Sequence, residues 1–166
     1  MLSIAQNINR KNNLGALSVI GIIVLILFMG CADIRLIGAY DKTTDETIQK
    51  VSKDISTLLI HIEKNFLDNK TADNEYDKFR DEYINIEGDI EALKIRTGAL
   101  PKYEMVKTQV SLLQDNLKLL EELHKSHFVI PGKNAIGLLE NTKVIFETAF
   151  TAMLTLQNNL RRDKAN

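Results

Sequence analysis

Apolar side chains recur in alternating steps of three and four residues between Tyr76 and Thr97. This spacing places them at the a and d positions of a heptad, where they form one continuous stripe along an α-helix. The residues on the stripe are Tyr76, Phe79, Tyr83, Ile86, Ile90, Leu93 and Thr97. A helix with such a stripe buries it against other helices, so this segment predicts a helical bundle.

Three other segments have the same kind of spacing. Their stripes are Ile48, Val51, Ile55, Leu59, Ile62 and Phe66; then Tyr103, Val106, Val110, Leu113, Leu117, Leu120, His124 and His127; and then Ile136, Leu139, Phe146, Phe150, Met153 and Leu160. With the first segment, they predict an all-α fold whose four helices span about 44–68, 73–98, 101–128 and 134–161.

Local signals mark the ends of the predicted helices. Residues 43–46 read Thr-Thr-Asp-Glu, a capping box that is expected to begin the first helix. The polar residues 68–73 predict a turn, whose final Asp is expected to cap the second helix. Gly98 followed by Pro101 ends that helix and begins the third, and the Pro-Gly pair at 131–132 ends the third.

Because these connections are short, residues 43–166 are expected to form an antiparallel up-down-up-down four-helix bundle. A pair of long hairpins that completes the bundle only in a homodimer is the alternative. The heptad pattern does not distinguish between the two arrangements, since both bury the same stripes.

The N-terminal part of the chain differs chemically from the rest. No acidic residue precedes Asp33, and the only basic residues before it are Arg10 and Lys11. An uncharged apolar run begins at Leu14 and continues to the residue before Cys31. Positive charge followed by an apolar run is typical of an export signal, which would deliver the rest of the chain across a membrane.

The end of this run, Leu27-Phe28-Met29-Gly30-Cys31, resembles the lipobox of bacterial lipoproteins. In that family a small residue precedes a cysteine that becomes lipidated, and Gly30 and Cys31 match these two positions. Phe28 departs from the pattern, because the family usually has Leu there. Cys31 is the only cysteine in the chain and cannot form an internal disulfide. The resemblance implies lipidation at Cys31, with palmitate or a similar acyl group.

The predicted domain organisation follows from these signals. Residues 1–30 are a signal peptide or a membrane anchor, residues 31–42 are a tether, and residues 43–166 are the bundle. The alternative to cleavage and lipidation is an uncleaved transmembrane helix over residues 14–32, which is about long enough to cross a bilayer. Both interpretations attach the chain to a membrane.

The lipoprotein resemblance also implies a location in the bacterial cell envelope, facing the periplasm. In enteric lipoproteins, the absence of Asp directly after the lipidated cysteine favours the outer membrane over the inner membrane, and Ala32 occupies that position here. The chain also resembles a group of small uncharacterised all-helical envelope lipoproteins, and the resemblance lies in residues 40–45, 93–96 and 100–102. That resemblance implies a helical architecture and no particular activity.

Several functional classes are disfavoured by composition and motifs. The formal net charge is -1, whereas a nucleic-acid-binding face needs clustered Lys and Arg. The chain lacks a Gly-rich phosphate loop, a Gly-x-Ser-x-Gly elbow and a Cys-x-x-Cys-His haem motif. We therefore expect no enzyme, no cofactor and no nucleic-acid partner.

Histidines on the third helix are the only weak candidates for a metal site. Glu121 and His124 form one Glu-x-x-His pair, but a ferritin-like diiron site needs two such pairs. His124 and His127 lie one turn apart on the same face and could hold a transition metal together. Structural histidines are the expected interpretation, and His61 is expected to be solvated.

Two functional hypotheses remain from the sequence. The first is a membrane-tethered, non-catalytic module that binds a protein partner in the cell envelope, in assembly, inhibition or exclusion. The second is a periplasmic bundle that senses or binds a small molecule or metal in a polar pocket around Arg96 or His124. For Arg96, the expected structural role is to cap a helix or pair with a carboxylate across the turn.

Overall fold

A computed structural model of the chain describes residues 38–128 and 133–165. These residues form four long helices and no strand. The helices are α2 (Lys42–Leu67), α3 (Arg80–Ala99), α4 (Glu104–His127) and α5 (Lys133–Ala165), and two short 3-10 turns, η1 (Thr71–Asn74) and η2 (Tyr76–Lys78), connect α2 to α3. The predicted all-α fold is therefore confirmed.

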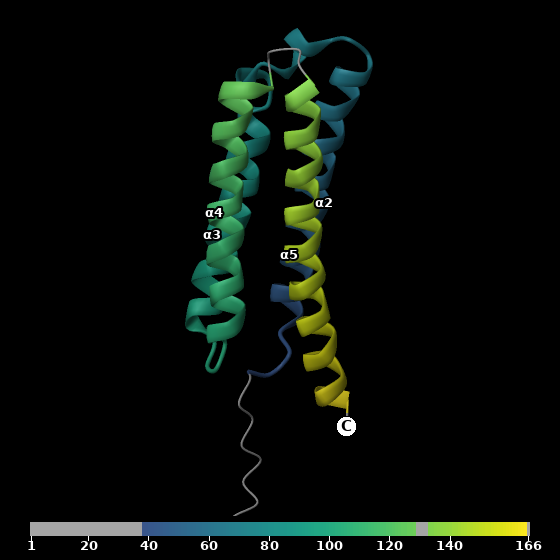
Figure 1. The fold of residues 1–166 in the computed structure, drawn as a ribbon. Coiled ribbons are helices and arrows are strands. Elements are labelled where there is room, and N and C mark those ends of the chain that lie inside the picture. Colours follow the sequence, from purple (N-terminus) through teal and green to yellow (C-terminus); the bar gives the residue numbers. More distant parts are fainter. Residues whose placement is uncertain (1–37, 129–132, 166) are drawn as a thin grey trace, which may run out of the picture. The chain divides into compact units, whose positions relative to one another are not determined.

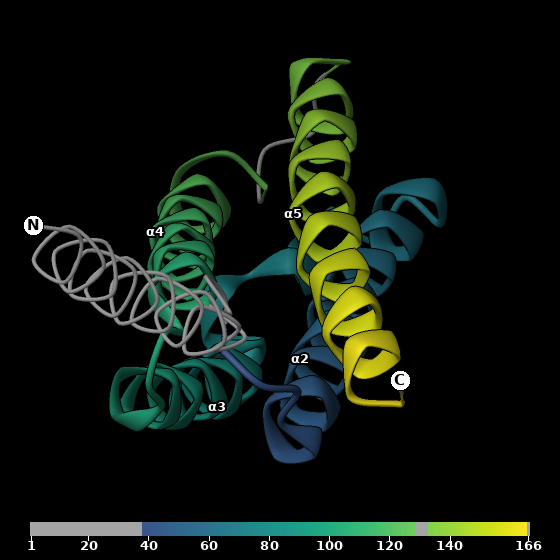
Figure 2. The same ribbon diagram turned by 90° about the horizontal axis from the view of Figure 1, so that it is seen from below.

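The four helices pack as a bundle in which each helix lies beside its neighbours in sequence (Figure 1). Viewed along the helix axes, α5 also lies beside α2 and closes the ring (Figure 2). The connection between α3 and α4 lies at the same end as the start of α2 and the end of α5 (Figure 1). One chain thus supplies all four helices of the up-down-up-down arrangement.

The predicted heptad stripes form most of the core. On α2, α3 and α4, the stripe residues are buried up to His124, apart from Tyr76, which is half-buried. Leu58 is also fully buried beside the first stripe. Ile136 was expected in the core, and this prediction was wrong, because its side chain is 46% exposed.

The error at Ile136 has a geometric cause. The buried residues of α5 are Ala135, Leu139, Thr142, Phe146, Phe150, Met153, Gln157 and Leu160. Around Phe146 this series contains two successive four-residue steps, so the buried stripe is not a strict heptad. At the start of α5 the stripe runs through Ala135, and its larger neighbour Ile136 faces outward.

Helix α2 begins slightly earlier than expected, and its cap is Asp41. The Asp41 carboxylate accepts hydrogen bonds from the Thr44 backbone N–H at 2.8 Å and from the Thr44 hydroxyl at 2.6 Å. The predicted capping box at 43–46 is therefore wrong. An acidic N-cap satisfies exposed amides and carries the negative charge that a helix N-terminus favours.

The second helix begins later than expected. Asp73 does not cap it, because residues 71–78 form the two 3-10 turns and α3 starts at Arg80. Asn74 stabilises this path, since its side-chain amide donates to the Ile62 carbonyl at 3.1 Å and accepts from the Asn65 side chain at 2.9 Å. A 3-10 turn repeats every three residues, so Tyr76 and Phe79 still point to the same side.

The third helix also starts later than the predicted residue 101. Lys102 has a φ angle of 61°, in the left-handed region, which a right-handed helix cannot contain. Helix α4 therefore begins at Glu104, with Tyr103 as its N-cap residue. The resulting tight turn brings Tyr103 under the N-terminal end of the described chain.

Gln157 generates a prediction about stability. It is fully buried on α5, and neither atom of its amide group has a hydrogen-bond partner within the described residues. Replacing it with Met keeps the shape and removes the desolvated amide. We expect Gln157→Met to raise the free energy of unfolding by about 1–3 kcal/mol in urea denaturation followed by circular dichroism.

Gln114 provides the matched control for this change. Its amide is half-buried and bonds to Lys94 and Glu91, so Gln114→Met should give no gain in stability. A destabilised Gln157→Met protein would contradict the inference that the buried amide is a cost to the fold.

Candidate functional site: the tether end of the bundle

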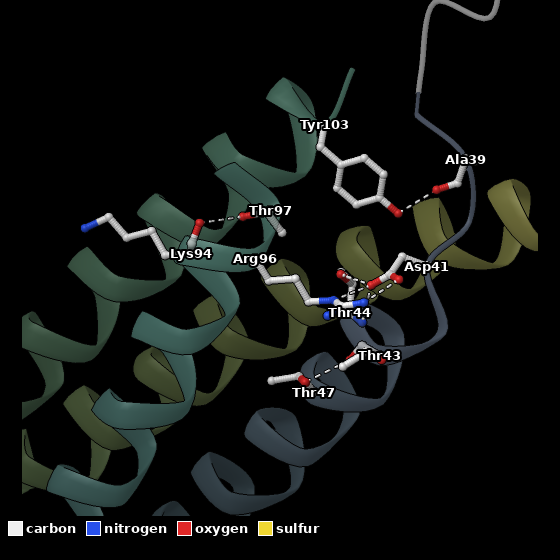
Figure 3. Close-up of polar contacts among 9 residues, drawn as sticks. All are labelled: Ala39, Asp41, Thr43, Thr44, Thr47, Lys94, Arg96, Thr97 and Tyr103. Carbon is white, nitrogen blue, oxygen red and sulfur yellow. Dashed lines mark hydrogen bonds and ion pairs between the residues drawn. The ribbon is translucent and has the colours of Figure 1, made fainter. Parts of the chain in front are cut away.

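The last residues of the predicted tether are fixed to one end of the bundle. Asp41 is the centre of this contact, because its carboxylate caps α2 and also receives both hydrogen bonds of a forked pair from Arg96 on α3 (Figure 3). Arg96 Nε lies 2.6 Å from Asp41 Oδ2, and Arg96 Nη2 lies 2.7 Å from Asp41 Oδ1. This two-pronged geometry is the strong form of an Arg–carboxylate pair. Arg96 thus pairs with a carboxylate, as expected, but the partner is Asp41 at the start of α2 and not a residue across the turn after α3.

The Asp41 carboxylate is strongly stabilised in its ionised form. The hydrogen bonds from Arg96 are the largest cause, and they hold the pKa of Asp41 well below its ordinary value. Burial acts in the opposite direction, and the bonds from Thr44 add to the lowering. The pair is thus an ionised link between the start of α2 and the end of α3.

The connection between α3 and α4 holds the tether from a second side. The Tyr103 hydroxyl donates to the Ala39 carbonyl at 2.7 Å, as Figure 3 shows, and the Gly38 N–H donates to the Lys102 carbonyl at 2.8 Å. Gly38 lies so close to the Tyr103 ring that an added Cβ would stand 2.3 Å from a ring carbon. Only glycine fits between this ring and the turn at Pro101.

Helix α5 holds the tether from a third side. Arg161 forms an ion pair with the buried Asp45 and donates to the Tyr40 hydroxyl at 3.1 Å. Its guanidinium also lies over the Tyr40 ring, 5.0 Å from the centroid. Burial raises the pKa of Asp45, but hydrogen bonds from Gln49, Tyr40 and Arg161 outweigh it, so the pKa is lowered overall.

We call these contacts the tether clamp. Its members are Gly38, Ala39, Tyr40, Asp41, Asp45, Arg96, Tyr103 and Arg161. Both arginines of the clamp are paired with carboxylates, so the charges are balanced within the chain. Of its members, Arg96 was singled out from the sequence, while Asp41, Asp45 and Arg161 were missed because they are joined only through the fold.

His124 lies in a second polar cluster, in the part of α4 farthest from the Tyr103 turn. Its side chain is fully buried among aromatic rings, with Phe79, Phe128 and Tyr83 at centroid distances of 5.0, 5.5 and 5.7 Å. Its Nε2 lies 2.8 Å from the backbone carbonyl of Asn74, and its Nδ1 lies 3.0 Å from the Tyr83 hydroxyl. Both ring nitrogens therefore have partners within the chain.

These contacts assign the protonation state of His124. A carbonyl only accepts, so Nε2 must carry the proton that points at Asn74. Nδ1 then accepts from the Tyr83 hydroxyl, whose own pKa is raised by burial. Burial lowers the pKa of His124, while the bond to Asn74 opposes this, and the net direction is downward. His124 is a neutral structural histidine.

Glu121 has hydrogen-bond partners other than His124, and His61 lies on another helix. Glu121 is the acceptor of a 2.5 Å bond from the Tyr76 hydroxyl and a 2.7 Å bond from Lys125. The side chain of His127 lies outside the described residues. His61 is exposed, and its Nδ1 lies 3.9 Å from Glu82 Oε1. Within residues 38–128 and 133–165, no group of three or more His, Cys, Asp or Glu side chains is placed to hold a metal.

Comparison with known proteins gives no family for this chain: no protein-family model, curated protein sequence or solved structure matches it. The predicted signal segment and Cys31 lie outside the described residues. Among the helices from α2 to α5, none combines the length and apolar character needed to cross a bilayer.

The tether clamp predicts a pH-dependent stability. We expect Asp41→Asn to lower the free energy of unfolding at pH 7 by about 1 kcal/mol, because Asn still caps α2 but loses the charge opposite the half-exposed Arg96. Because the folded pKa of Asp41 is depressed, its contribution is present above the ordinary value of 3.8 and is lost as the pH falls below it. Urea denaturation at a series of pH values measures this difference.

The difference between wild type and Asp41→Asn should therefore shrink as the pH falls below 3.8. The exposed Asp77, which lies in η2, provides a control, and Asp77→Asn should leave the unfolding free energy almost unchanged. A gap between wild type and Asp41→Asn that stays constant down to strongly acidic pH would contradict an ionised clamp.

A separate prediction concerns His124, in the second polar cluster. Its imidazole should be the neutral Nε2–H tautomer at pH values near and above the ordinary pKa of 6.5. Long-range ¹H–¹⁵N spectra of the histidine rings report the tautomer directly. An Nδ1–H tautomer or a charged ring would contradict the assignment.

Tyr83→Phe, which removes the donor to Nδ1 of His124, should lower the free energy of unfolding by about 1–3 kcal/mol in urea denaturation.

Proposed function

We propose that this protein is a lipid-anchored, non-catalytic interaction module of the bacterial cell envelope. Cys31 would carry the lipid group, and the four-helix bundle would face the periplasm and bind an envelope protein. The outer membrane is the favoured host membrane, as the resemblance to lipoproteins implies. An assembly, inhibition or exclusion role fits a module of this kind.

The tether clamp is the observation that supports this proposal most directly. A flexible linker would leave a bundle free to turn, but here residues 38–41 are held by α3, α5 and the turn before α4. Only seven residue steps separate Cys31 from Gly38. Even fully extended, this length spans no more than about 25 Å. A lipid on Cys31 would therefore keep the clamped end of the bundle close to the membrane.

The hydrogen bonds inside the bundle also favour a protein-binding role over a ligand-sensing role. In the sensor alternative, a polar pocket was expected around Arg96 or His124. Arg96 instead bonds to Asp41. The two ring nitrogens of His124 bond to Tyr83 and Asn74. Side chains with internal partners stabilise the fold and leave little for a ligand. Around Arg96 and His124, no contact within the described residues favours the sensor alternative, so we propose an interaction through the outer helix faces.

The intact mass of the membrane-extracted protein tests the proposal. We expect the wild-type chain to lose residues 1–30 and to gain the mass of an acyl-bearing lipid on Cys31. Cys31→Ser should abolish both changes, because the thiol is the lipid acceptor. An unmodified full-length mass for both proteins would replace the lipid anchor with a transmembrane segment at residues 14–32.

Ala32→Ser is the matched control for this experiment. It introduces the same residue type one position after the cysteine and leaves the thiol in place. This variant should have the processed, lipid-bearing mass of the wild type. If Ala32→Ser blocked processing as Cys31→Ser does, the effect would not report on the thiol.

A further inference from the structure

Helix α4 carries a second stripe in addition to the one that faces the core. The outer stripe consists of Met105, Gln109, Leu112, Asn116, Leu119 and Leu123. These residues follow one another in alternating steps of four and three, as the core stripe does. A helix with two heptad stripes has two faces that can pack against helices, and the bundle of one chain uses only the first.

Three residues of the outer stripe are accessible in the single chain. Met105, Leu112 and Leu119 are 53%, 58% and 49% exposed, respectively. Gln109, Asn116 and Leu123 are half-buried beside them. On the other described helices, no exposed large apolar residue recurs three times at seven-residue intervals. Three such residues in line indicate a helix-packing surface rather than scattered surface hydrophobics.

A groove accompanies the stripe along the boundary of α4 and α5. Asn116, Leu119 and Leu123 of α4 line one side, and Leu138 and Ile145 of α5 line the other. The exposed apolar groups therefore border a concave surface, into which the ridge of another helix can fit.

The chemistry of the outer stripe identifies its occupant. Read as a heptad, Met105, Leu112 and Leu119 occupy d positions, while Gln109, Asn116 and Leu123 occupy a positions. Leu is the usual d residue of parallel two-stranded coiled coils, and an Asn at one a position, here Asn116, specifies register and oligomeric state. The Asn116 amide is satisfied best by the same amide of an identical helix. We propose that the outer stripe of α4 binds the outer stripe of a second copy, in parallel and in register.

The direction of pairing agrees with the tether clamp. Gly38, the first described residue, bonds to Lys102, so residues 38–41 of the tether lie at the N-terminal end of α4. Two parallel copies of α4 then place both tethers at the same end, facing one membrane. An antiparallel pair would place the tethers at opposite ends. In this respect the inference rests on the proposed function and deepens it, because it names a second copy as a partner.

Disulfide cross-linking of the full-length chain tests the pairing. In a Cys31→Ser background, single cysteines replace Met105, Leu112 or Leu119, and the detergent-extracted protein is oxidised with diamide. In a parallel, in-register dimer, each d position lies beside its own counterpart, within the reach of a disulfide. We expect all three variants to form covalent dimers about tenfold or more faster than the control, because paired thiols have a high effective concentration.

Ile95→Cys is the matched control, since Ile95 is 68% exposed and lies on α3. If Leu112→Cys alone forms dimers, and Met105→Cys and Leu119→Cys form a disulfide only when the two proteins are mixed, the pairing is antiparallel and the proposal is overturned. Rates equal to that of Ile95→Cys for all three variants would also overturn it, and would leave the groove to a foreign helix.

A second measurement keeps the test independent of cysteine chemistry. Leu112→Glu should shift the sedimenting species of the full chain from dimer to monomer without loss of helical signal, whereas Ile95→Glu should remain a dimer. A Leu112→Glu protein that stays dimeric would contradict the interface. Because the cross-linked chain carries Cys31→Ser, failure of lipidation in the mass experiment and failure of dimerisation here are separate results.

Discussion

The carboxylate of Asp41 is the interaction on which the tether end of the molecule depends. It accepts from the Thr44 amide in the first turn of α2 and pairs with Arg96 of α3, so one group joins two helices and the incoming chain. Around it, Tyr103 and Arg161 bring the turn before α4 and the end of α5 to the same segment. Residues 39–41 are thereby ordered by hydrogen bonds to α3, α5 and the turn before α4, together with the contact between Arg161 and the Tyr40 ring.

A different polar cluster organises the connection between α2 and α3. Asn74 uses its side chain to hold the end of α2 and its carbonyl to hold His124 of α4. Between the two clusters, the apolar stripes provide most of the buried surface. Apolar stripes specify that helices pack but tolerate sliding, whereas buried hydrogen bonds with one geometry specify register. Asp41 and Asn74 thus fix the bundle in one arrangement.

The sequence predicted what depends on periodicity and missed what depends on contacts between distant residues. The stripes of α2, α3 and α4 were found because each helix repeats its own pattern, and Ile136 was misplaced because α5 departs from the heptad near Phe146. The capping box at 43–46 was a good local signal, but α2 is capped by the earlier Asp41, whose carboxylate is also held by Arg96, 55 residues away in sequence. Likewise, nothing near His124 in sequence indicates that Asn74 and Tyr83 satisfy its two nitrogens.

The tether clamp and the outer stripe of α4 have complementary physical consequences. Three exposed apolar side chains per copy, with the groove beside them, form a small interface. Two chains anchored in one membrane have already lost much of their translational and rotational freedom, and the clamp would remove part of what remains by holding each bundle near the surface. The proposed lipid anchor would therefore strengthen a pairing that the stripe supports by itself, and the amide of Asn116 would keep such pairing selective for identical helices in the same direction.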